Sequence, residues 1–259
     1  MALTNVEWAS LVKEKISEVF KLPDFSRATP ASALSNDELA FTIDHTLLKP
    51  DATPAQIDEL CDQALQYKFK SCCVNGVHIE QVARRLKGSS SIPCCVIGFP
   101  LGAGSSKSKA FEAAQAVSDG AKEIDMVISI GALKTGEYSR VYDDIRAVVD
   151  ASAGNLVKVI LETVFLSDEE KVAAAFISAE AGAAFVKTCT GFSGGGASAA
   201  DVALMKKSVA YKGSVMVKAS AGIRSYEKCL EMLDAGADRI GTSSGVPIIE
   251  KAVSHGGTY

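Results

Sequence analysis

The sequence predicts an α/β fold, a single (β/α)8 TIM barrel with a short N-terminal helical extension. From residue 41 onwards, short apolar runs alternate with longer amphipathic runs, which is typical of βα units around a parallel sheet. Eight such units follow one another in a chain of 259 residues, the usual length of one closed barrel. Turns that contain glycine precede several of the apolar runs, where glycine suits the end of a helix.

Each element follows from its pattern. The predicted strands are residues 41–44, 70–75, 93–98, 123–129, 156–162, 184–188, 215–219 and 239–242, and the helices between and after them are 54–67, 78–86, 107–119, 138–151, 168–181, 200–210, 225–235 and 246–254. Residues 1–40 form an accessory segment, with one helix over 6–20 and a second near 37–40. We therefore expect a helical extension over 1–40 and a catalytic barrel over 41–259 that ends in a flexible tail. An open doubly wound sheet is the alternative, but residues 45–50, HTLLKP, are not a dinucleotide-binding loop.

Composition excludes several classes of function. Apolar residues make up 47% and charged residues 22%, which is typical of a soluble globular enzyme. The net charge of −4 provides no basic field for nucleic acid or an anionic membrane. No apolar run is long enough to span a membrane, and no signal peptide precedes the first helix, so we expect a cytoplasmic protein. The seven cysteines lack disulfide or metal spacing, and the adjacent pairs at 72–73 and 94–95 are expected in the core.

Charged residues interrupt strands that are otherwise apolar. Asp125, Lys158, Lys187 and Lys218 lie within predicted strands, and Asp44 and Glu162 are expected at strand ends. One interpretation is a structural ion-pair network, in which Asp44, Asp125 and Glu162 neutralise the lysines. Lys187 and Lys218 each precede a loop rich in glycine and serine, at the barrel end where active sites lie. This placement favours a catalytic role for Lys187 and Lys218 over a purely structural one.

Two neighbouring lysines can make one amine nucleophilic. A Schiff base requires a neutral amine, whereas an ordinary lysine has a pKa of about 10.4. A second ammonium about 4 Å away disfavours the charged form by roughly 4 kcal/mol at an effective dielectric of about 20, or about three pKa units. Asp125 could then hold Lys218 protonated and help to move protons.

Three loops could bind an anion. Residues 190–196 (TGFSGGG), 220–224 (SAGIR) and 241–245 (GTSSG) follow the sixth, seventh and eighth strands. Barrels often hold phosphate on the last two of these loops, through backbone N–H groups and the N-terminus of a helix. The simpler alternative is that Ser243 or Ser244 caps a helix and that the glycines are turn residues. No nucleotide-binding glycine motif is present.

At this point the motifs resemble those of the deoxyribose-phosphate aldolases. The matching stretches run in order from about residue 41 to 253: IDHTLLKP at 43–50, SCCVN at 71–75, VIGFPLGA at 96–103, KAFEA at 109–113, EIDMVI at 123–128, KVILET at 158–163, FVKTCTGFS at 185–193, VKAS at 217–220 and RIGTSSG at 239–245. The resemblance implies a (β/α)8 barrel and the reversible cleavage of 2-deoxy-D-ribose 5-phosphate to acetaldehyde and D-glyceraldehyde 3-phosphate. It implies no metal and no organic cofactor.

The resemblance also assigns residues. It implies that Lys187 forms the Schiff base and that Lys218 and Asp125 handle protons. It places Cys73, Thr46 and Thr190 beside the substrate, and Gly191, Gly222, Ser243 and Ser244 on the phosphate loops. Some members use a C-terminal tyrosine in proton transfer, and this chain ends in Tyr259; the alternative is a disordered tail.

Three positions depart from the family pattern. Ala221 replaces a glycine in the loop after the seventh strand, so we expect weaker phosphate affinity at most. Gly76 replaces a proline and Ser129 an asparagine. Two other functions remain open, a Schiff-base aldolase with another phosphorylated acceptor and a catalytically silent relative that acts as a binding or scaffold protein. The sequence leaves the oligomeric state open, with a homodimer among the options.

Overall fold

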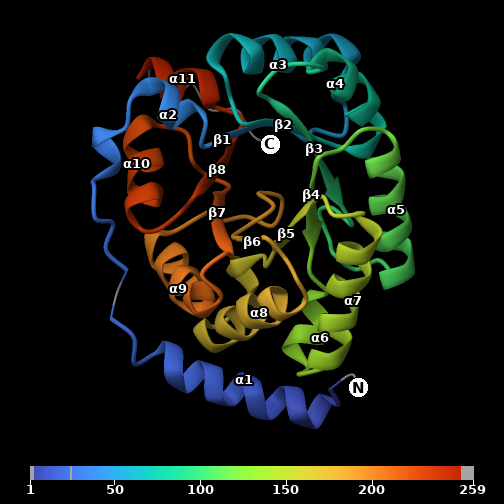
Figure 1. The fold of residues 1–259 in the computed structure, drawn as a ribbon, viewed down its shortest axis with the longest axis vertical. Coiled ribbons are helices and arrows are strands. Elements are labelled where there is room, and N and C mark those ends of the chain that lie inside the picture. Colours follow the sequence, from blue (N-terminus) through green and yellow to red (C-terminus); the bar gives the residue numbers. More distant parts are fainter. Residues whose placement is uncertain (1–2, 24, 252–259) are drawn as a thin grey trace.

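A closed barrel of parallel strands forms the centre of the molecule (Figure 1). The computed structural model describes residues 3–23 and 25–251. The strands are β1 Ile43–Leu47, β2 Ser71–Val74, β3 Ile92–Ile97, β4 Glu123–Val127, β5 Leu156–Ile160, β6 Phe185–Lys187, β7 Met216–Ser220 and β8 Arg239–Thr242. They follow one another in sequence order around the barrel, and β1 closes it by pairing with both β2 and β8. The predicted fold class is confirmed.

Helices surround the barrel as an outer ring (Figure 1). The ring consists of α3 Pro54–Tyr67, α4 Ile79–Arg85, α5 Ser106–Ser118, α7 Tyr138–Ala151, α8 Asp168–Glu180, α9 Ala199–Val209, α10 Tyr226–Asp234 and α11 Gly245–Glu250. The additional helices are α1 Asn5–Val19, α2 Asn36–Ala40 and α6 Ile130–Lys134, with single 3-10 turns η1 Ala31–Ala33, η2 Gly76–His78, η3 Thr163–Phe165 and η4 Ala210–Lys212. Reciprocal capping boxes begin α3 and α8, at Thr53 and Ser167, which explains why these helices start where the sequence predicts.

The strand side chains divide between two apolar environments. Cys72 and Cys95 pack into the main core between the barrel and the helices. Cys73 and Cys94, their neighbours in the chain, belong to a separate cluster inside the barrel. This division follows from the alternation of side chains along a strand. All seven cysteines are free and buried, so their interpretation as core residues is confirmed.

The predicted bounds of β1 and β5 were wrong at the positions where acidic residues were expected to end the strands. Strand β1 begins at Ile43 and continues through Thr46, so Asp44 does not close it but lies inside the barrel wall. Phe41 instead ends α2 and is half exposed. Strand β5 ends at Ile160, and Glu162 lies beyond it in a left-handed backbone conformation (φ +56°).

The N-terminal extension lies against the outer ring of helices. Helix α1 packs across α7, α8 and α9 (Figure 1). Its anchor is Trp8, which is only 3% exposed and whose ring lies 5.0 Å from that of Tyr142 and 6.1 Å from that of Phe176. Further along, η1 contacts α10, and α2 contacts α11. The division into an extension and a catalytic barrel stays a prediction.

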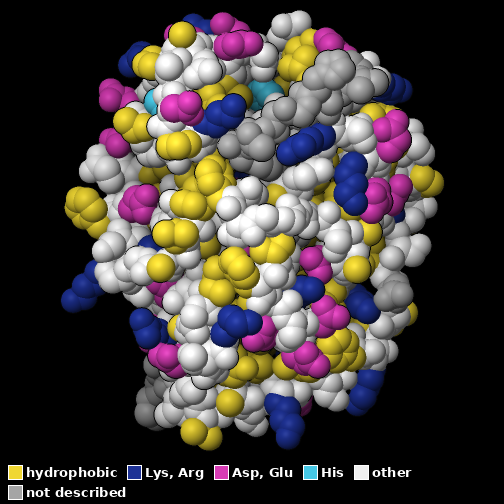
Figure 2. Space-filling view, turned by 180° about the vertical axis from the view of Figure 1, so that it is seen from behind, with side chains coloured by type: hydrophobic (Ala, Val, Ile, Leu, Met, Phe, Trp, Pro, Cys, Tyr) yellow, Lys and Arg dark blue, Asp and Glu magenta, His cyan; other side chains and the backbone are white. Residues whose placement is uncertain are grey.

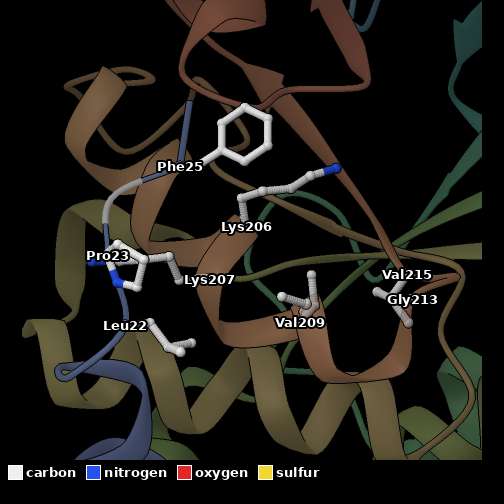
Figure 3. A pocket seen from close by; sticks show the side chains of 9 residues that line it. Leu22, Pro23, Phe25, Lys206, Lys207, Val209, Gly213 and Val215 are labelled. Atoms are coloured by element: carbon white, nitrogen blue, oxygen red, sulfur yellow. The ribbon is translucent and has the colours of Figure 1, made fainter. Parts of the chain in front are cut away.

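A hollow of about 440 Å³ lies under this extension (Figure 3). Leu22, Pro23 and Phe25 face the end of α9 across it, with Val209 and Val215 on its floor. Because Val215 directly precedes β7, the hollow opens at the amino end of that strand. It is therefore remote from the barrel end at which active sites form.

The surface carries both signs of charge. On the face shown in Figure 2, lysine and arginine side chains are interspersed with aspartate and glutamate. Such a mixed surface does not concentrate a polyanion. Among the described helices, none is both long and apolar enough to cross a membrane.

Candidate active site

Four neighbouring strands bring the predicted ionisable residues together inside the barrel. Asp125 pairs with Lys158 in the register of β4 and β5, and Lys187 pairs with Lys218 in the register of β6 and β7. All four are at most 2% exposed. The predicted lysine pair therefore exists as a structural pair.

Asp125 is the centre of this cluster. Its Oδ2 accepts hydrogen bonds from the Nζ atoms of Lys187 and Lys218, each at 2.8 Å. Its Oδ1 accepts from Lys158 Nζ at 2.8 Å and from Cys94 Sγ at 3.2 Å. One carboxylate thus holds the two lysine amines side by side, which is the arrangement that the Schiff-base argument requires.

Two further carboxylates and an arginine complete the cluster. Asp44 lies 2.5 Å from Lys218 Nζ and 2.7 Å from Arg239 Nη1. Glu123 lies 2.5 Å from Lys158 Nζ and 3.0 Å from Arg239 Nη1. Glu123 and Arg239 were missed from the sequence. The signal for Glu123 was its spacing of two from Asp125, which places both side chains on one face of β4.

Glu162 does not neutralise a lysine in this cluster. Its carboxylate accepts instead from the backbone N–H of Thr190 at 3.1 Å, from the Thr190 hydroxyl at 2.5 Å and from the Ser193 hydroxyl at 3.4 Å. The alternative interpretation, in which Glu162 helps to neutralise the lysines, is therefore wrong for this residue, because the chain turns away after β5.

Charge within the cluster is unbalanced when every group is ionised. Three carboxylates, those of Asp44, Glu123 and Asp125, face four cations, those of Lys158, Lys187, Lys218 and Arg239. Among the described residues, Asp125 is the one carboxylate within ion-pair distance of Lys187, whereas each other cation contacts at least two. Lys187 is therefore the amine of the cluster that is held by the fewest carboxylates.

The pKa shifts follow from these contacts. Burial alone would raise the pKa of Asp125, but Lys158, Lys187 and Lys218 lower it well below its ordinary value. Burial alone would lower the pKa of Lys218, but Asp125 and Asp44 outweigh it and raise that pKa. Lys218 therefore remains an ammonium beside Lys187, as the sequence argument requires of the second lysine.

Small apolar side chains line the barrel interior next to the charges. Cys73, Cys94, Val96 and Leu48 form the inner cluster, against which Phe99 packs. The cluster lies on β1–β3, whereas the charged residues come mainly from β4–β8. The interior thus offers an apolar wall to a short carbon chain held at the lysines.

One group in the described part of the chain has the spacing of metal ligands. The Sγ atoms of Cys73 and Cys94 and a carboxylate oxygen of Asp125 lie within 4.8 Å of one another. Both oxygens of Asp125 are already hydrogen-bonded to lysine ammonium or amine groups. A cation at this point would face Lys158 and Lys187, so the charges disfavour a metal.

Hydrogen bonds join the three glycine-rich loops, and the Thr242 hydroxyl at the start of the last one donates to Ile223 O at 2.7 Å. Thr188 and Ser220 tie the roots of two loops together, because the Thr188 hydroxyl donates to Ser220 O at 2.8 Å and accepts from Ser220 N at 2.9 Å. Further out, Ala197 N donates to Ala221 O at 2.9 Å. The loop after β6 and the loop after β7 therefore form one connected surface.

Predicted substrate-contacting residues lie on or beside this surface. Thr46 is in β1 and Cys73 in β2, in register with each other, and Thr190 and Gly191 follow β6. Gly222, with φ +75°, and the exposed Ser243 lie on the next two loops. Their positions at the carboxyl ends of strands fit the predicted roles, which stay predictions. Tyr259 lies outside the described residues.

The capping alternative for the last loop finds no support at Ser244. This residue occupies the N-cap position of α11, but its side chain makes no capping hydrogen bond. Its backbone N–H instead donates to the Thr242 hydroxyl at 2.9 Å.

Of the residues that depart from the family pattern, Ala221 has a visible consequence. It is buried and has φ +81°, a left-handed conformation that favours glycine. Gly76 begins η2 with ordinary space around it, and Ser129 precedes α6. Of the three departures, Ala221 is thus the one that places a side chain on a backbone conformation that favours glycine.

The fold and the site together define a (β/α)8 barrel protein with a lysine-centred charged cluster inside the barrel, in which Lys187 stands at the carboxyl end of β6. A family model described as DeoC/LacD family aldolase matches residues 39–251. The chain belongs to this aldolase family.

Similar proteins extend the match over most of the chain. A deoxyribose-phosphate aldolase of Finegoldia magna is 58% identical over 213 residues, which covers 82% of this chain and 99% of the relative. A crystal structure of a candidate deoxyribose-phosphate aldolase from Coccidioides immitis superposes with a TM-score of 0.91 at 40% identity, over 96% of this chain and 98% of that one. The tetrameric deoxyribose phosphate aldolase from Aeropyrum pernix gives a TM-score of 0.78 at 32% identity, over 92% and 96% of the two chains.

Proposed function

We propose that this chain is a deoxyribose-phosphate aldolase, which cleaves 2-deoxy-D-ribose 5-phosphate reversibly to acetaldehyde and D-glyceraldehyde 3-phosphate. The observation that carries the proposal is the buried lysine pair, in which Lys187 and Lys218 share Oδ2 of Asp125 and Lys187 has no second carboxylate partner among the described residues. A neutral amine next to an ammonium is what carbonyl addition requires. The names of the similar proteins supply the substrate.

In the proposed mechanism, Lys187 Nζ attacks C1 of the substrate and loss of water gives a protonated Schiff base. The positive nitrogen draws the electron pair of the C2–C3 bond as that bond breaks, while the C3 hydroxyl gives up its proton. This releases glyceraldehyde 3-phosphate and leaves an enamine, which takes a proton at C2. Hydrolysis of the resulting iminium then releases acetaldehyde and the free amine.

Lys218 and Asp125 supply the proton transfers in this scheme. The Lys218 ammonium and Lys187 share Oδ2 of Asp125, so a proton can pass between them and the bound intermediate. The loops after β6, β7 and β8 would hold the phosphate through backbone N–H groups and the hydroxyls of Ser243 and Ser244.

Borohydride trapping tests the proposal. Reduction of the protein in the presence of acetaldehyde should leave a two-carbon adduct on Lys187, located by peptide mass mapping. Lys187→Leu should abolish the adduct and the turnover of 2-deoxyribose 5-phosphate without unfolding the barrel, because it replaces a buried amine with an apolar chain. Lys122→Leu, at an exposed lysine, is the matched control and should react like the parent. Folded protein with no adduct and no turnover would favour the silent relative instead.

We further propose that the chain acts as a homodimer in the cytoplasm. The Aeropyrum pernix relative assembles from several copies, and seven free thiols suit a reducing compartment. Sedimentation velocity of the purified protein tests the assembly, and a monomer would contradict it. Fractionation of the cells that make the protein tests its location.

A further inference from the structure

Glu162 is a buried acid that the proposed mechanism does not use. Its side chain is fully buried, and no described lysine or arginine forms an ion pair with it. Its backbone has φ +56°, a conformation that costs a non-glycine residue free energy. Such a backbone conformation persists only when the surrounding contacts fix the residue.

The group that Glu162 holds is the loop between β6 and α9. Its carboxylate accepts from the N–H and the hydroxyl of Thr190 and from the hydroxyl of Ser193. The Thr190 hydroxyl in turn accepts from Phe192 N at 3.1 Å. The carboxylate thus fixes the first half of the loop, directly and through one relay.

Other contacts hold this loop at its root, where Thr188 bonds Ser220, and at Phe192, whose ring lies 5.2 Å from that of Phe99, but its middle is made of glycines. Gly191, Gly194 and Gly195 all have positive φ, and Gly196 follows them. Glycines lose much conformational freedom on ordering, so a loop with four of them needs external restraints. Glu162 restrains its first half, and the bond from Ala197 N to Ala221 O restrains its end.

The restrained loop is the one that carries two predicted substrate contacts, Thr190 and Gly191. It is also joined to the loop of Gly222, so a change in its position reaches the anion-binding loop after β7 as well. Lys187 by contrast lies in β6 itself and is held by Asp125. Loss of the Glu162 restraint should therefore affect phosphate recognition and leave the amine chemistry intact.

We propose that Glu162 is a positioning residue that holds the β6–α9 loop in its phosphate-binding form and so sets the preference for a phosphorylated substrate. This inference rests on the proposed function. It assigns to a buried carboxylate a role in recognising an anion that it does not touch.

The test compares two substrates that differ only in the phosphate. Glu162→Gln keeps the size of the side chain but replaces one acceptor oxygen with a donor, which cannot accept from both groups of Thr190. We expect kcat/KM for 2-deoxyribose 5-phosphate to fall about tenfold, mainly through KM, because the lost contacts act on binding. For unphosphorylated 2-deoxyribose we expect a fall of less than about twofold, and the borohydride adduct on Lys187 should form as before.

Two other variants make the result interpretable. Glu112→Gln is the matched control, since Glu112 accepts from Gly98 N at 2.8 Å on the loop after β3 but is not linked to the β6–α9 loop; it should leave the substrate preference unchanged. Ser193→Ala removes one weak contact and keeps the buried carboxylate. It should show a smaller loss, about twofold to threefold, that is again confined to the phosphorylated substrate, and it serves as the test if Glu162→Gln does not fold.

Equal losses on both substrates, or no loss on either, would overturn the role of Glu162. Failure of the proposed function is distinguishable from this outcome, because it would show in the parent protein as the absence of both turnover and the Lys187 adduct.

Discussion

Ala221 is a residue whose side chain opposes its backbone conformation. At φ +81° an alanine costs roughly 1–2 kcal/mol compared with glycine, whereas glycine costs about 0.4–1 kcal/mol more in lost chain entropy. We therefore expect Ala221→Gly to raise the free energy of unfolding by up to about 1 kcal/mol, measured by urea denaturation. Because the loop is predicted to hold phosphate, KM for 2-deoxyribose 5-phosphate should also fall, by about twofold to fivefold.

A neighbouring alanine provides the control for this prediction. Ala219 is equally buried but lies in β7, where glycine has only the entropic disadvantage and leaves a small gap. Ala219→Gly should lower stability by about 1 kcal/mol. If both variants lose stability alike, the left-handed conformation of Ala221 carries no strain and the prediction is wrong.

For single residues, the sequence could identify the charged side chains of the cluster but could not decide which lysine is the nucleophile. The presence of lysines in apolar strands predicted the cluster, and their positions before glycine-rich loops favoured Lys187 and Lys218. The choice between these two depended on the family resemblance. The physical reason for it lies in Asp44 and Glu123, which come from β1 and β4 and neutralise the other cations. Such a ranking needs the register of distant strands, which a linear pattern does not contain.

At the scale of elements, capping and periodicity predicted the helices well. Helices α3 and α7 begin and end at the predicted residues, because capping or amphipathic signals mark them. The error at β1 has a different cause. Asp44, His45 and Thr46 look like a polar loop in sequence. In the barrel, Asp44 accepts a hydrogen bond from Ser71 of the next strand, whereas His45 faces outward and bonds Gln63 of α3.

Helix α1 gives a prediction at this scale. A helix of 15 residues is marginal alone, so its stability depends on packing against α7 and α8 through Trp8. Trp8→Ala should lower the free energy of unfolding by about 3 kcal/mol, as for other large buried side chains, measured by urea denaturation followed by far-UV circular dichroism. Trp8 is the single tryptophan of the chain, so its emission in the parent protein reports on α1 directly.

The control for α1 is Leu11→Ala, at a position that is 38% exposed, which should cost less than about 1 kcal/mol. In the parent protein, tryptophan emission and circular dichroism should give one coincident transition if α1 unfolds together with the barrel. A tryptophan transition that precedes the loss of helix would show instead that the extension detaches on its own.

At the scale of the whole molecule, alternation of elements was sufficient to predict the closed barrel. Eight βα units leave no edge strand when β1 pairs with β8, and the apolar outer faces of the strands are covered by the ring of helices. What alternation could not predict is that the interior of this barrel is occupied by ionised groups. The stability of the whole fold therefore depends on pH through that interior.

The pH dependence has a definite sign on each side of neutrality. The pKa values of Asp44 and Asp125 are lowered in the folded protein by Lys218, Lys158 and the other cations of the cluster. Their contribution to stability is complete above the unfolded value of about 3.9 and is lost as pH falls below it. The pKa values of Lys158 and Lys218 are raised, so their contribution is complete below about 10.4 and is lost as pH rises above it. Burial lowers the pKa of His45, so stability already begins to fall below about pH 6.5, and burial raises the pKa of thiols such as Cys95 and Cys229, so it begins to fall above about pH 8.5. We expect the free energy of unfolding to be flat only from about pH 7 to 8 and to fall on both sides.

Asp44→Asn isolates one carboxylate of this interior. Each carboxylate with a lowered pKa contributes about 1.4 kcal/mol per pH unit to the acid slope, because the unfolded chain binds a proton that the folded chain does not. The variant should be less stable at neutral pH by about 3 kcal/mol or more, since Lys218 and Arg239 lose a partner. Its acid slope, measured by urea denaturation between pH 3 and 5, should be shallower than that of the parent by up to about 1.4 kcal/mol per pH unit. Equal acid slopes in the parent and the variant would mean that the cluster does not hold Asp44 ionised. Asp44 could then not serve as the second carboxylate partner that distinguishes Lys218 from Lys187.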